Sequence, residues 1–319
     1  MKRLSTGKLL LLLALLAAAA CAAVATGAVN IPFSELFAEQ NRQILLLRSA
    51  RVLLAMMAGA GLAVAGVALQ AVLRNPLAEP YLLGTSSGAG LGAVAAVAAG
   101  LSGLLLPLCA FSGALGATFL VYMLARQRGR VPLQSLLLAG VIVSVGLSSV
   151  IVFLLSISRS DSLHGQMWWL WGSLQVYDLR LLFWASCLVV PGIGILYFFS
   201  RDLNAISLGE EEALHLGIKT ETLKKTIFFV TSLITAGLVS VCGTIGFVGL
   251  IIPHTVRLMV GSNHKVLIPV SCICGAVFMV LCDLLSRKLF APLEIPVGVI
   301  TAITGAPLFI ILLKGTQKK

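Results

Sequence analysis

The chain has 319 residues, of which 59% are hydrophobic and only 11% are charged, and its formal net charge is +11. A soluble domain carries about 25% charged residues, so this chain cannot cover a water-facing surface and is solvated mainly by lipid. The apolar runs are long and continuous rather than alternating, which predicts an all-α polytopic membrane protein. The basic residues stand in short breaks between these runs and are not interleaved with aromatic residues, so we expect no nucleic-acid partner.

The N-terminal segment carries Lys2, Arg3 and Lys8 before an uncharged stretch from Leu9 to Val29. Such a pattern is also typical of a secretory signal peptide, and Cys21 after three alanines resembles a lipoprotein processing site. However, the stretch is longer than the apolar region of a signal peptide, and a further membrane run follows it. We therefore expect an uncleaved first membrane helix.

Seven further uncharged runs follow, at 52–73, 81–125, 131–158, 181–200, 226–256, 266–282 and 295–313. A membrane span needs about 20 residues, so the run 81–125 must hold two helices, with Pro107 near the turn. The run 226–256 is either one long helix or two shorter ones that part near Gly243–Gly246. Hydropathy alone thus predicts nine or ten spans in a single membrane domain over residues 1–319.

The distribution of basic residues selects ten spans. Basic residues stand at both ends of the chain, and if both termini are cytoplasmic the number of spans is even. Threading ten spans puts 16 of the 23 Lys and Arg residues inside and 7 outside, in agreement with the positive-inside rule. The loop around Arg128 and the segment 201–225 are then cytoplasmic.

Few residues could carry chemistry. Asp283 is the one acid well inside an apolar run, and Arg287 stands four residues later, as in an ordinary i,i+4 pair. The seven cysteines lie in apolar runs, which indicates free thiols packed as small hydrophobic groups. The sequence has no P-loop, catalytic constellation or metal-ligand spacing, and a lone His254 is expected to be structural. We expect a transporter subunit rather than an enzyme, with no bound metal or cofactor.

Small residues recur along the spans, and they indicate close helix packing, although some could be hinges of a gate. They are Gly59, Ala63, Gly66, Gly88, Gly92, Gly113, Gly116, Gly243, Gly246 and Gly249.

One polar segment, about residues 201–220, stands apart from the spans. Ser207 and Glu210 have the spacing of a capping box, and Glu210–Glu212 load a first helical turn, where the helix dipole favours acids. Gly217 is a natural helix end. This short cytoplasmic helix is either an ordinary loop helix or a docking helix for a cytoplasmic partner, and the segment by itself does not favour one over the other.

Two long stretches carry a resemblance to a known family. The first is Arg48-Ser-Ala-Arg51 with GAGLAVAGVALQAVLRNPLAEPYLLGTSSGAGLGA, which ends at Ala93. The second runs from Gly243 through GFVGLIIPHTVRLMVGSNHK to Asp283-x-x-x-Arg287 and EIPVGVITAITGAPLF. Together with LNAISLGEEEALHLGI they resemble the FecCD-type permeases, membrane subunits of ABC importers for iron siderophores, haem and vitamin B12. The resemblance covers about residues 45–314, and it departs at Ala50, where the family usually has proline.

The resemblance implies a type II ABC importer permease with ten helices, so that the run 226–256 is two helices. It implies a homodimer or close heterodimer in the bacterial inner membrane, with the pathway at the dimer interface. It further implies two cytoplasmic ABC ATPase subunits, which use ATP and Mg, and an extracytoplasmic substrate-binding protein. An iron siderophore is the first choice of substrate, with vitamin B12 or haem as alternatives. A secondary transporter without an ATPase is the competing function, and it would need ion ligands in the spans.

The resemblance also assigns residues to roles. Docking of the binding protein falls to Arg48, Arg51 and Arg287. Coupling to the ATPase falls to Ser207, Leu208, Gly209, Glu210, Glu211, Ala213, Leu216 and Gly217. Helix packing or the pathway falls to Gly59, Gly66, Gln70, Asn75, Pro76, Gly84, Gly88, Gly92, Gly246, Gly249 and Pro253.

Overall fold

The computed structural model describes residues 6–27, 32, 38–127, 131–158, 160–176 and 178–316. Arg128 therefore lies outside the described residues. The α-helices in the described part are α1 (Thr6–Ala25), α2 (Arg42–Val72), α3 (Thr85–Ala98), α4 (Leu105–Ala125), α5 (Leu133–Ile157), α6 (Ser160–Leu170), α7 (Leu179–Phe198), α8 (Ser200–Ile206), α9 (Glu210–His215), α10 (Thr220–Cys242), α11 (Val248–Val260), α12 (His264–Lys288) and α13 (Val297–Thr316). Two short 3-10 helices, η2 (Glu39–Asn41) and η3 (Pro80–Leu83), precede α2 and α3.

The helices confirm the all-α polytopic architecture. Among the described residues, seven helices are long and apolar enough to cross a membrane, namely α1, α2, α4, α5, α7, α10 and α12. The shorter apolar helices α3, α11 and α13 complete the ten expected spans. Both expected divisions are present, because α3 and α4 part before Pro107, and α10 and α11 part at Gly243–Phe247.

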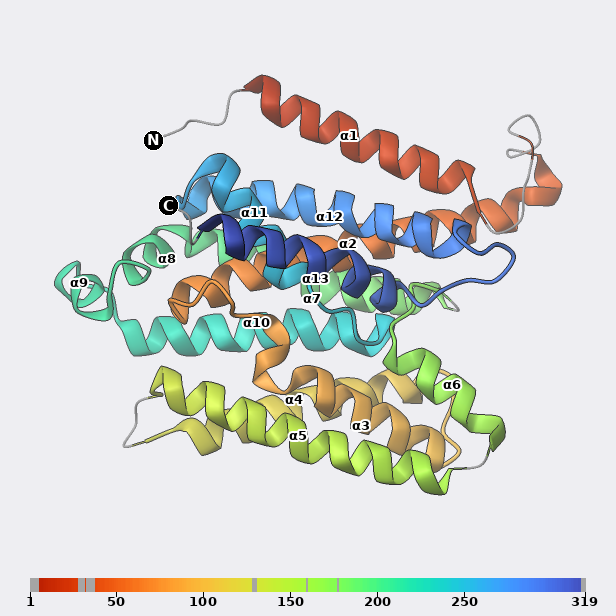
Figure 1. The fold of residues 1–319 in the computed structure, drawn as a ribbon, viewed down its shortest axis with the longest axis horizontal. Coiled ribbons are helices and arrows are strands. Elements are labelled where there is room, and N and C mark those ends of the chain that lie inside the picture. The colour runs from red at the N-terminus through yellow and green to blue at the C-terminus, as the bar shows by residue number, and fades with distance from the viewer. Residues whose placement is uncertain are drawn as a thin grey trace.

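Helix α2 is the centre of the molecule. It packs against α12, α10, α11 and α7, and 83% of the residues in its most apolar stretch are buried. Its sequence from Ala58 to Ala71 is rich in glycine and alanine, so neighbouring backbones can approach it closely. By contrast, α1 lies along the outside of the bundle against α12 (Figure 1).

Glycines mark the closest helix crossings. A Cβ atom added at Gly59 would overlap the carbonyl oxygen of Gly275 in α12, and one at Gly66 would overlap that of Gly249 in α11. Gly88 in α3 meets Gly113 in α4 in the same way. Gly116 and Gly246 are different, because an added Cβ would meet nothing closer than 3.8 Å. Small residues therefore set the helix spacing at the first three crossings, where van der Waals packing holds the bundle.

The two ends of the bundle differ in what they carry (Figure 1). Helices α8 and α9, the start of α1 and the end of α13 lie at one end, which we call the α9 end. Helix α6, the end of α1, the start of α2 and the α12–α13 connection lie at the other, the α6 end. Both chain termini are thus at one end, as an even number of spans requires.

Candidate functional site

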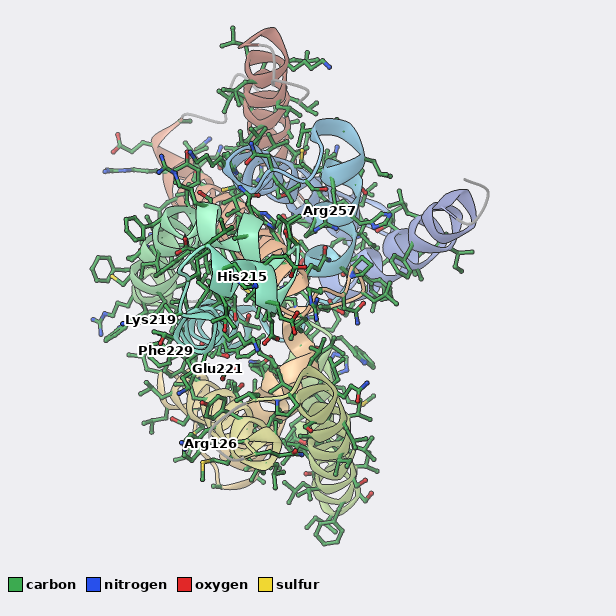
Figure 2. The ribbon with its side chains drawn as sticks, turned by 90° about the vertical axis from the view of Figure 1, so that its left-hand side faces the viewer. Arg126, His215, Lys219, Glu221, Phe229 and Arg257 are labelled. Atoms are coloured by element: carbon green, nitrogen blue, oxygen red, sulfur yellow. The ribbon has the colours of Figure 1, made fainter. Side chains whose placement is uncertain are left out.

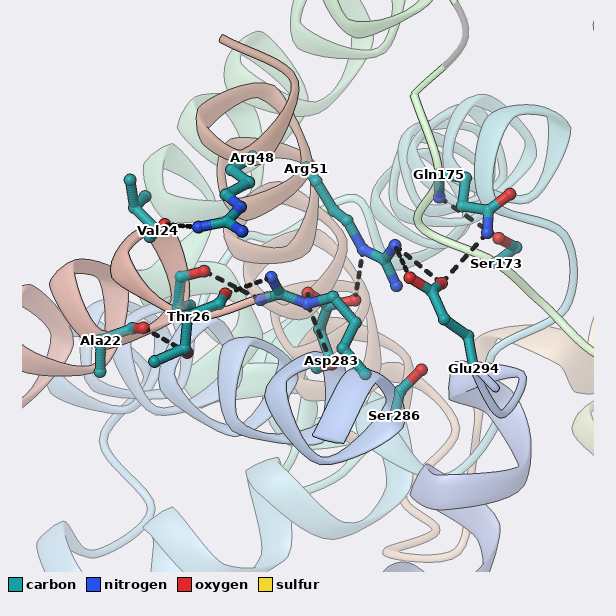
Figure 3. Close-up of polar contacts among 12 residues, drawn as sticks. Ala22, Val24, Thr26, Arg48, Arg51, Ser173, Gln175, Asp283, Ser286 and Glu294 are labelled. Atoms are coloured by element: carbon teal, nitrogen blue, oxygen red, sulfur yellow. Dashed lines mark hydrogen bonds and ion pairs between the residues drawn. The ribbon is translucent and has the colours of Figure 1, made fainter. Parts of the chain in front are cut away.

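Three polar regions could serve transport: a cluster at the α6 end, a break between α10 and α11, and the α8–α9 segment at the α9 end. The cluster at the α6 end, here called the arginine cluster, consists of Arg48, Arg51, Asp283, Arg287 and Glu294. Figure 3 shows it, with Arg48, Arg51, Asp283 and Glu294 labelled. The cluster brings together α2, α12 and the loop before α13. All three arginines that were predicted to dock the binding protein are in it.

Arg51 is the link between the two acids of the arginine cluster. Its Nε lies 2.9 Å from Asp283 Oδ1, and its Nη1 lies 2.9 Å from Glu294 Oε2. Gln175 also donates to Glu294, at 3.1 Å. Burial raises the pKa of the Glu294 carboxyl, but the charge of Arg51 and the hydrogen bonds from Gln175 and Arg51 outweigh it, so the pKa is lowered overall.

Arg287 and Arg48 are turned towards α1. Arg287 pairs with Asp283 at 3.0 Å, which is the i,i+4 pair that the sequence predicts. Its guanidinium also donates to the carbonyls of Ala23 and Thr26, and Arg48 donates to those of Val24 and Ala25 (Figure 3). Cations are favourable at a helix C-terminus, where carbonyl groups lack partners within the helix. These two arginines therefore fasten the end of α1 to the bundle.

The three arginines are not an open basic surface, as their docking role supposed. Arg48 and Arg287 are 8% and 2% exposed, and the side chain of Arg51 is 12% exposed. The cluster nevertheless contains three cations and two acids, so its formal charge is positive by one. Docking of the binding protein at these arginines stays a prediction. The binding protein would have to approach arginines that already contact acids and backbone carbonyls of this chain.

The second region is the break between α10 and α11. The Phe247 N–H donates to Glu79 Oε1 at 2.7 Å, and the Ile245 N–H donates to the Tyr81 hydroxyl at 3.1 Å. Phe247 precedes α11 with φ +71°, a left-handed conformation that is rare for a residue with a side chain. Glu79 thus accepts from the N-terminus of α11, where a helix dipole favours an acid.

Gln70 connects α2 to α11 below this break. Its amide nitrogen lies within 3.4 Å of the carbonyls of Ala78, Gly249 and Leu250, and its oxygen accepts from Arg257 at 3.1 Å. Asn75 closes the turn after α2, because its side-chain oxygen accepts the Leu77 N–H. The next residue, Pro76, is exposed, whereas Pro253 is buried inside α11.

Gly84 begins α3 with φ +76°, which favours glycine. Through the contacts of Gln70, Glu79 and Tyr81, the segment from Gln70 to Gly84 joins α2, α3 and α11.

The third region is the α8–α9 segment. Helix α9 ends in a Schellman motif, because Ile218 N–H bonds to the Ala213 carbonyl and Gly217 N–H bonds to the Leu214 carbonyl, with Gly217 at φ +80°. The expected capping box is wrong. Gly209 is the N-cap, and the Ser207 hydroxyl instead donates back to the Asn204 carbonyl, because Ser207 still belongs to the end of α8.

The α8–α9 segment is tied to the bundle on one side and exposed on the other. Lys224 in α10 lies 2.6 Å from Glu210 and 3.1 Å from Glu221. Ala213 is completely buried within this chain, whereas Leu208, Leu214 and Leu216 are 73%, 56% and 67% exposed. Figure 2 views this end, with His215, Lys219, Arg257 and Arg126. Three leucines thus stand among exposed charged and polar residues on this segment, and Ala213 does not belong to its exposed surface.

Sequence reasoning missed Glu79, Tyr81, Gln175 and Arg257 as contacts that organise the bundle. The position of Glu79 between Pro76 and Pro80 was the available signal, since an acid between prolines in a membrane chain indicates an irregular, buried segment. Gln175 carries no comparable signal. Among the described residues, no three His, Cys, Asp or Glu side chains come together as a metal site.

Comparison with known proteins gives a consistent result. The model of the FecCD transport family matches residues 12–315. The cobalamin import system permease protein BtuC of Halobacterium salinarum is 41% identical over 272 residues, which cover 85% of this chain and 73% of that protein. The Fe(3+) dicitrate transport system permease protein FecD of Escherichia coli is 38% identical over 268 residues, 83% of each chain.

Solved structures agree with these relatives. An inward-facing conformation of a transporter assigned to the metal-chelate type of ABC transporters superposes with a TM-score of 0.87 at 34% identity, over 96% of this chain and 98% of that one. PsaBC from Streptococcus pneumoniae, at 18% identity and a TM-score of 0.62 over 88% and 93% of the two chains, shares the fold. The family match over nearly the whole chain and the helical architecture show that this protein belongs to the FecCD transport family of membrane permeases.

Proposed function

We propose that this chain is the membrane subunit of an ATP-driven importer that moves a bulky metal chelate into the cytoplasm. Two copies, or one copy and a close relative, enclose the pathway between them. Two cytoplasmic ABC ATPase subunits supply the energy from ATP and Mg, and an extracytoplasmic binding protein delivers the substrate. The bacterial inner membrane is the proposed location, with the α9 end and both termini in the cytoplasm.

The observation that carries this proposal is the exposed surface of the α8–α9 segment. Leu208, Leu214 and Leu216 are exposed on a charged, polar segment that hydropathy places outside the bilayer. Large apolar side chains that gather in a water-facing segment are typical of a protein interface. Because the sequence contains no P-loop, ATP hydrolysis would have to come from the protein that covers this surface.

A metal chelate is the substrate class that fits the relatives and the side chains together. One relative is named for cobalamin import and another for Fe(3+) dicitrate transport. The acid Asp283 inside α12 is engaged with Arg51, and the half-buried Glu79 between α2 and η3 is engaged with the Phe247 backbone. A pathway without free carboxylates suits a whole chelate better than a stripped metal ion. An iron siderophore is the proposed cargo.

The proposal is tested by uptake into vesicles that contain this chain, its ATPase and its binding protein. Uptake of a ferric siderophore should require ATP inside the vesicle and the binding protein outside. Cobalamin and haem are presented in parallel, and preferred uptake of either would replace the siderophore. Uptake driven by a proton or sodium gradient without ATP would instead support the secondary transporter and reject the importer.

Docking of the binding protein at the arginine cluster is a separate proposal. The cluster has one cation in excess of its acids, and a two-fold dimer would present two such clusters. Acids on a partner would be attracted to this charge, with an association rate that falls as salt rises. A rate that does not change with salt would exclude docking by charge at this end.

A further inference from the structure

A cavity of about 710 Å³ lies at the α6 end, beside the arginine cluster, because Gln175 lines it and also donates to Glu294. Its lining comes from the last turns of α3 and α10, the first turns of α4 and α7, and α6, which lies across them. The volume falls within the range of about 300–1,000 Å³ that is usual for small-molecule sites. Its walls are mainly apolar, with Val94 and Val97 from α3 and Leu104 and Pro107 from the α4 side.

Gln166 is the feature of this cavity that points to a ligand. Its side chain lines the cavity and is 2% exposed, and neither its amide oxygen nor its amide nitrogen has a hydrogen-bond partner in the described structure. An unpaired buried amide is unfavourable, because both groups lose their hydrogen bonds to water. A ligand that brings a hydrogen-bond acceptor and a donor to this amide would restore both bonds.

The residues around the cavity indicate that it lies at the depth of a bilayer interface. All four tryptophans of the chain, Trp168, Trp169, Trp171 and Trp184, lie between residues 168 and 184, and the first two line the cavity. Tryptophan is enriched at the boundary between the hydrocarbon and the headgroups. Next to the lining residues, Leu105 and Phe183 are 51% and 66% exposed, as side chains that face lipid are.

We propose that this cavity holds a phospholipid without net charge, such as phosphatidylethanolamine, with one acyl chain among α3, α4 and α10 and its glycerol ester at Gln166. The ester carbonyl would accept from the Gln166 amide, and the headgroup ammonium would donate to the amide oxygen or to Asp178 at the rim. Among the described residues, the lining contains the carboxylate of Asp178 and no lysine or arginine, which disfavours a lipid with a net negative charge. This inference depends on membrane insertion and not on the substrate or the ATPase.

The experiment uses the full-length chain in vesicles of phosphatidylethanolamine and phosphatidylglycerol. The probe is phosphatidylethanolamine with a photoreactive diazirine in one acyl chain, and the labelled residues are located by mass spectrometry. Ser240–Cys242, which line the cavity from α10, should be labelled. Phe183–Trp184 on the exposed side of α7 should also be labelled, and they report insertion into the bilayer in every sample.

Two variants test the site, each with a matched control. Val97→Phe fills the cavity, and Val145→Phe adds the same bulk at an exposed position of α5. Gln166→Leu removes the amide, and Gln127→Leu does so in an exposed loop. The label at Ser240–Cys242, relative to that at Phe183–Trp184, should fall several-fold in both site variants and in neither control. If Gln166→Leu fails to insert, Val97→Phe still decides.

Three results would overturn the proposal. An unlabelled Ser240–Cys242 in the wild type would mean that the cavity holds only water. A label that neither site variant reduces would mean that it arises from elsewhere. A label displaced by excess ferric siderophore or cobalamin would make the cavity a substrate subsite rather than a lipid site.

Discussion

Arg51 donates to two acids that are far from it in the sequence, Asp283 in α12 and Glu294 before α13. Arg51 therefore has a structural role, because it joins α2 to α12 and to the loop before α13. Breaking a buried ion pair by removing one partner is strongly unfavourable, since the other charge stays buried without compensation. A charge reversal at Arg51 tests this role.

Arg51→Glu should lower the stability of the folded chain by about 3–5 kcal/mol, because a third carboxylate would face Asp283 and Glu294. Thermal unfolding of the purified protein in detergent measures the loss. Arg42→Glu is the control, as the Arg42 side chain is 81% exposed and should change little. An Arg51→Glu protein of normal stability that bound the binding protein poorly would assign Arg51 to docking alone.

Glu294 predicts a response to acid. Its pKa is lowered in the folded chain from the ordinary value of 4.5, so the charged form stabilises the fold. This contribution is complete above the ordinary pKa and is lost as pH falls below it through the lowered one. Glu294→Gln should therefore unfold at a temperature that changes less than that of the wild type between neutral pH and pH 3. Equal acid sensitivity of the two proteins would contradict this role.

At the scale of elements, the break before α11 depends on the segment that follows α2. Phe247 has a left-handed backbone, which costs of the order of 1–3 kcal/mol and persists where its surroundings hold it. Glu79 accepts the Phe247 N–H, and Tyr81 accepts the Ile245 N–H. Any movement of α11 during transport would have to carry the segment from Gln70 to Gly84 with it.

Glu79→Ala should destabilise the chain by about 1–3 kcal/mol, because the half-buried Phe247 N–H would lose its acceptor. Glu79→Gln keeps a side-chain carbonyl that can accept this hydrogen bond, so its loss should be smaller. Thermal unfolding ranks the two variants, with Glu39→Ala as the control, since the Glu39 side chain is 94% exposed. Equal losses for alanine and glutamine would show that the accepted hydrogen bond is not what Glu79 contributes.

Variants in helix α9 separate the stability of this chain from its binding to the ATPase. Ala213→Arg, at a completely buried position, should destabilise this chain itself, by at least the roughly 1–3 kcal/mol of overpacking. Leu214→Asp, at a 56% exposed position, should leave stability unchanged and reduce co-purification of the ATPase. Leu293→Asp is the control for both measurements, because Leu293 is an exposed leucine at the opposite, α6 end. Undiminished co-purification with Leu214→Asp would remove these leucines from the ATPase interface.

At the scale of the whole molecule, the segments that the charge bias assigns to the cytoplasm meet at the α9 end. Arg126, His215 and Lys219 all lie at that end, which faces the viewer in Figure 2, and α1 starts and α13 finishes at the same end (Figure 1). The predicted outer basic residues are at the opposite end, because Arg48 and Arg51 lie early in α2 and Arg287 lies in the last turn of α12 (Figure 1). The fold thus gathers each predicted side of the membrane at one end, and labelling can decide which end is inside.

Single cysteines at positions 126 and 211, in a background without the seven native cysteines, should resist a membrane-impermeant thiol reagent applied to whole cells. A cysteine at position 293, at the α6 end, should react, because Leu293 is 74% exposed. Opened membranes are the control in which all three positions react. Efficient labelling of 126 or 211 in intact cells would invert the proposed orientation.

The sequence by itself determined the class, the number of spans and their divisions. Continuous apolar runs predicted α-helices, and the charge bias selected ten spans, because both signals depend on local composition and on the transfer of side chains into lipid. The ends of α9 were only partly predictable. Gly217 identified the C-terminal end, but Ser207 was taken by the end of α8, which a spacing rule cannot detect.

The tertiary structure alone decided what the charged residues contact. Arg51 and Asp283 are 232 residues apart, and nothing local in either segment indicates that they pair. The burial of Ala213 and the exposure of Leu214 likewise depend on how α9 lies against α8 and α10. Partners distant in the sequence are fixed by the packing of whole helices, and in this chain that packing converts three apparent surface arginines into an internal junction.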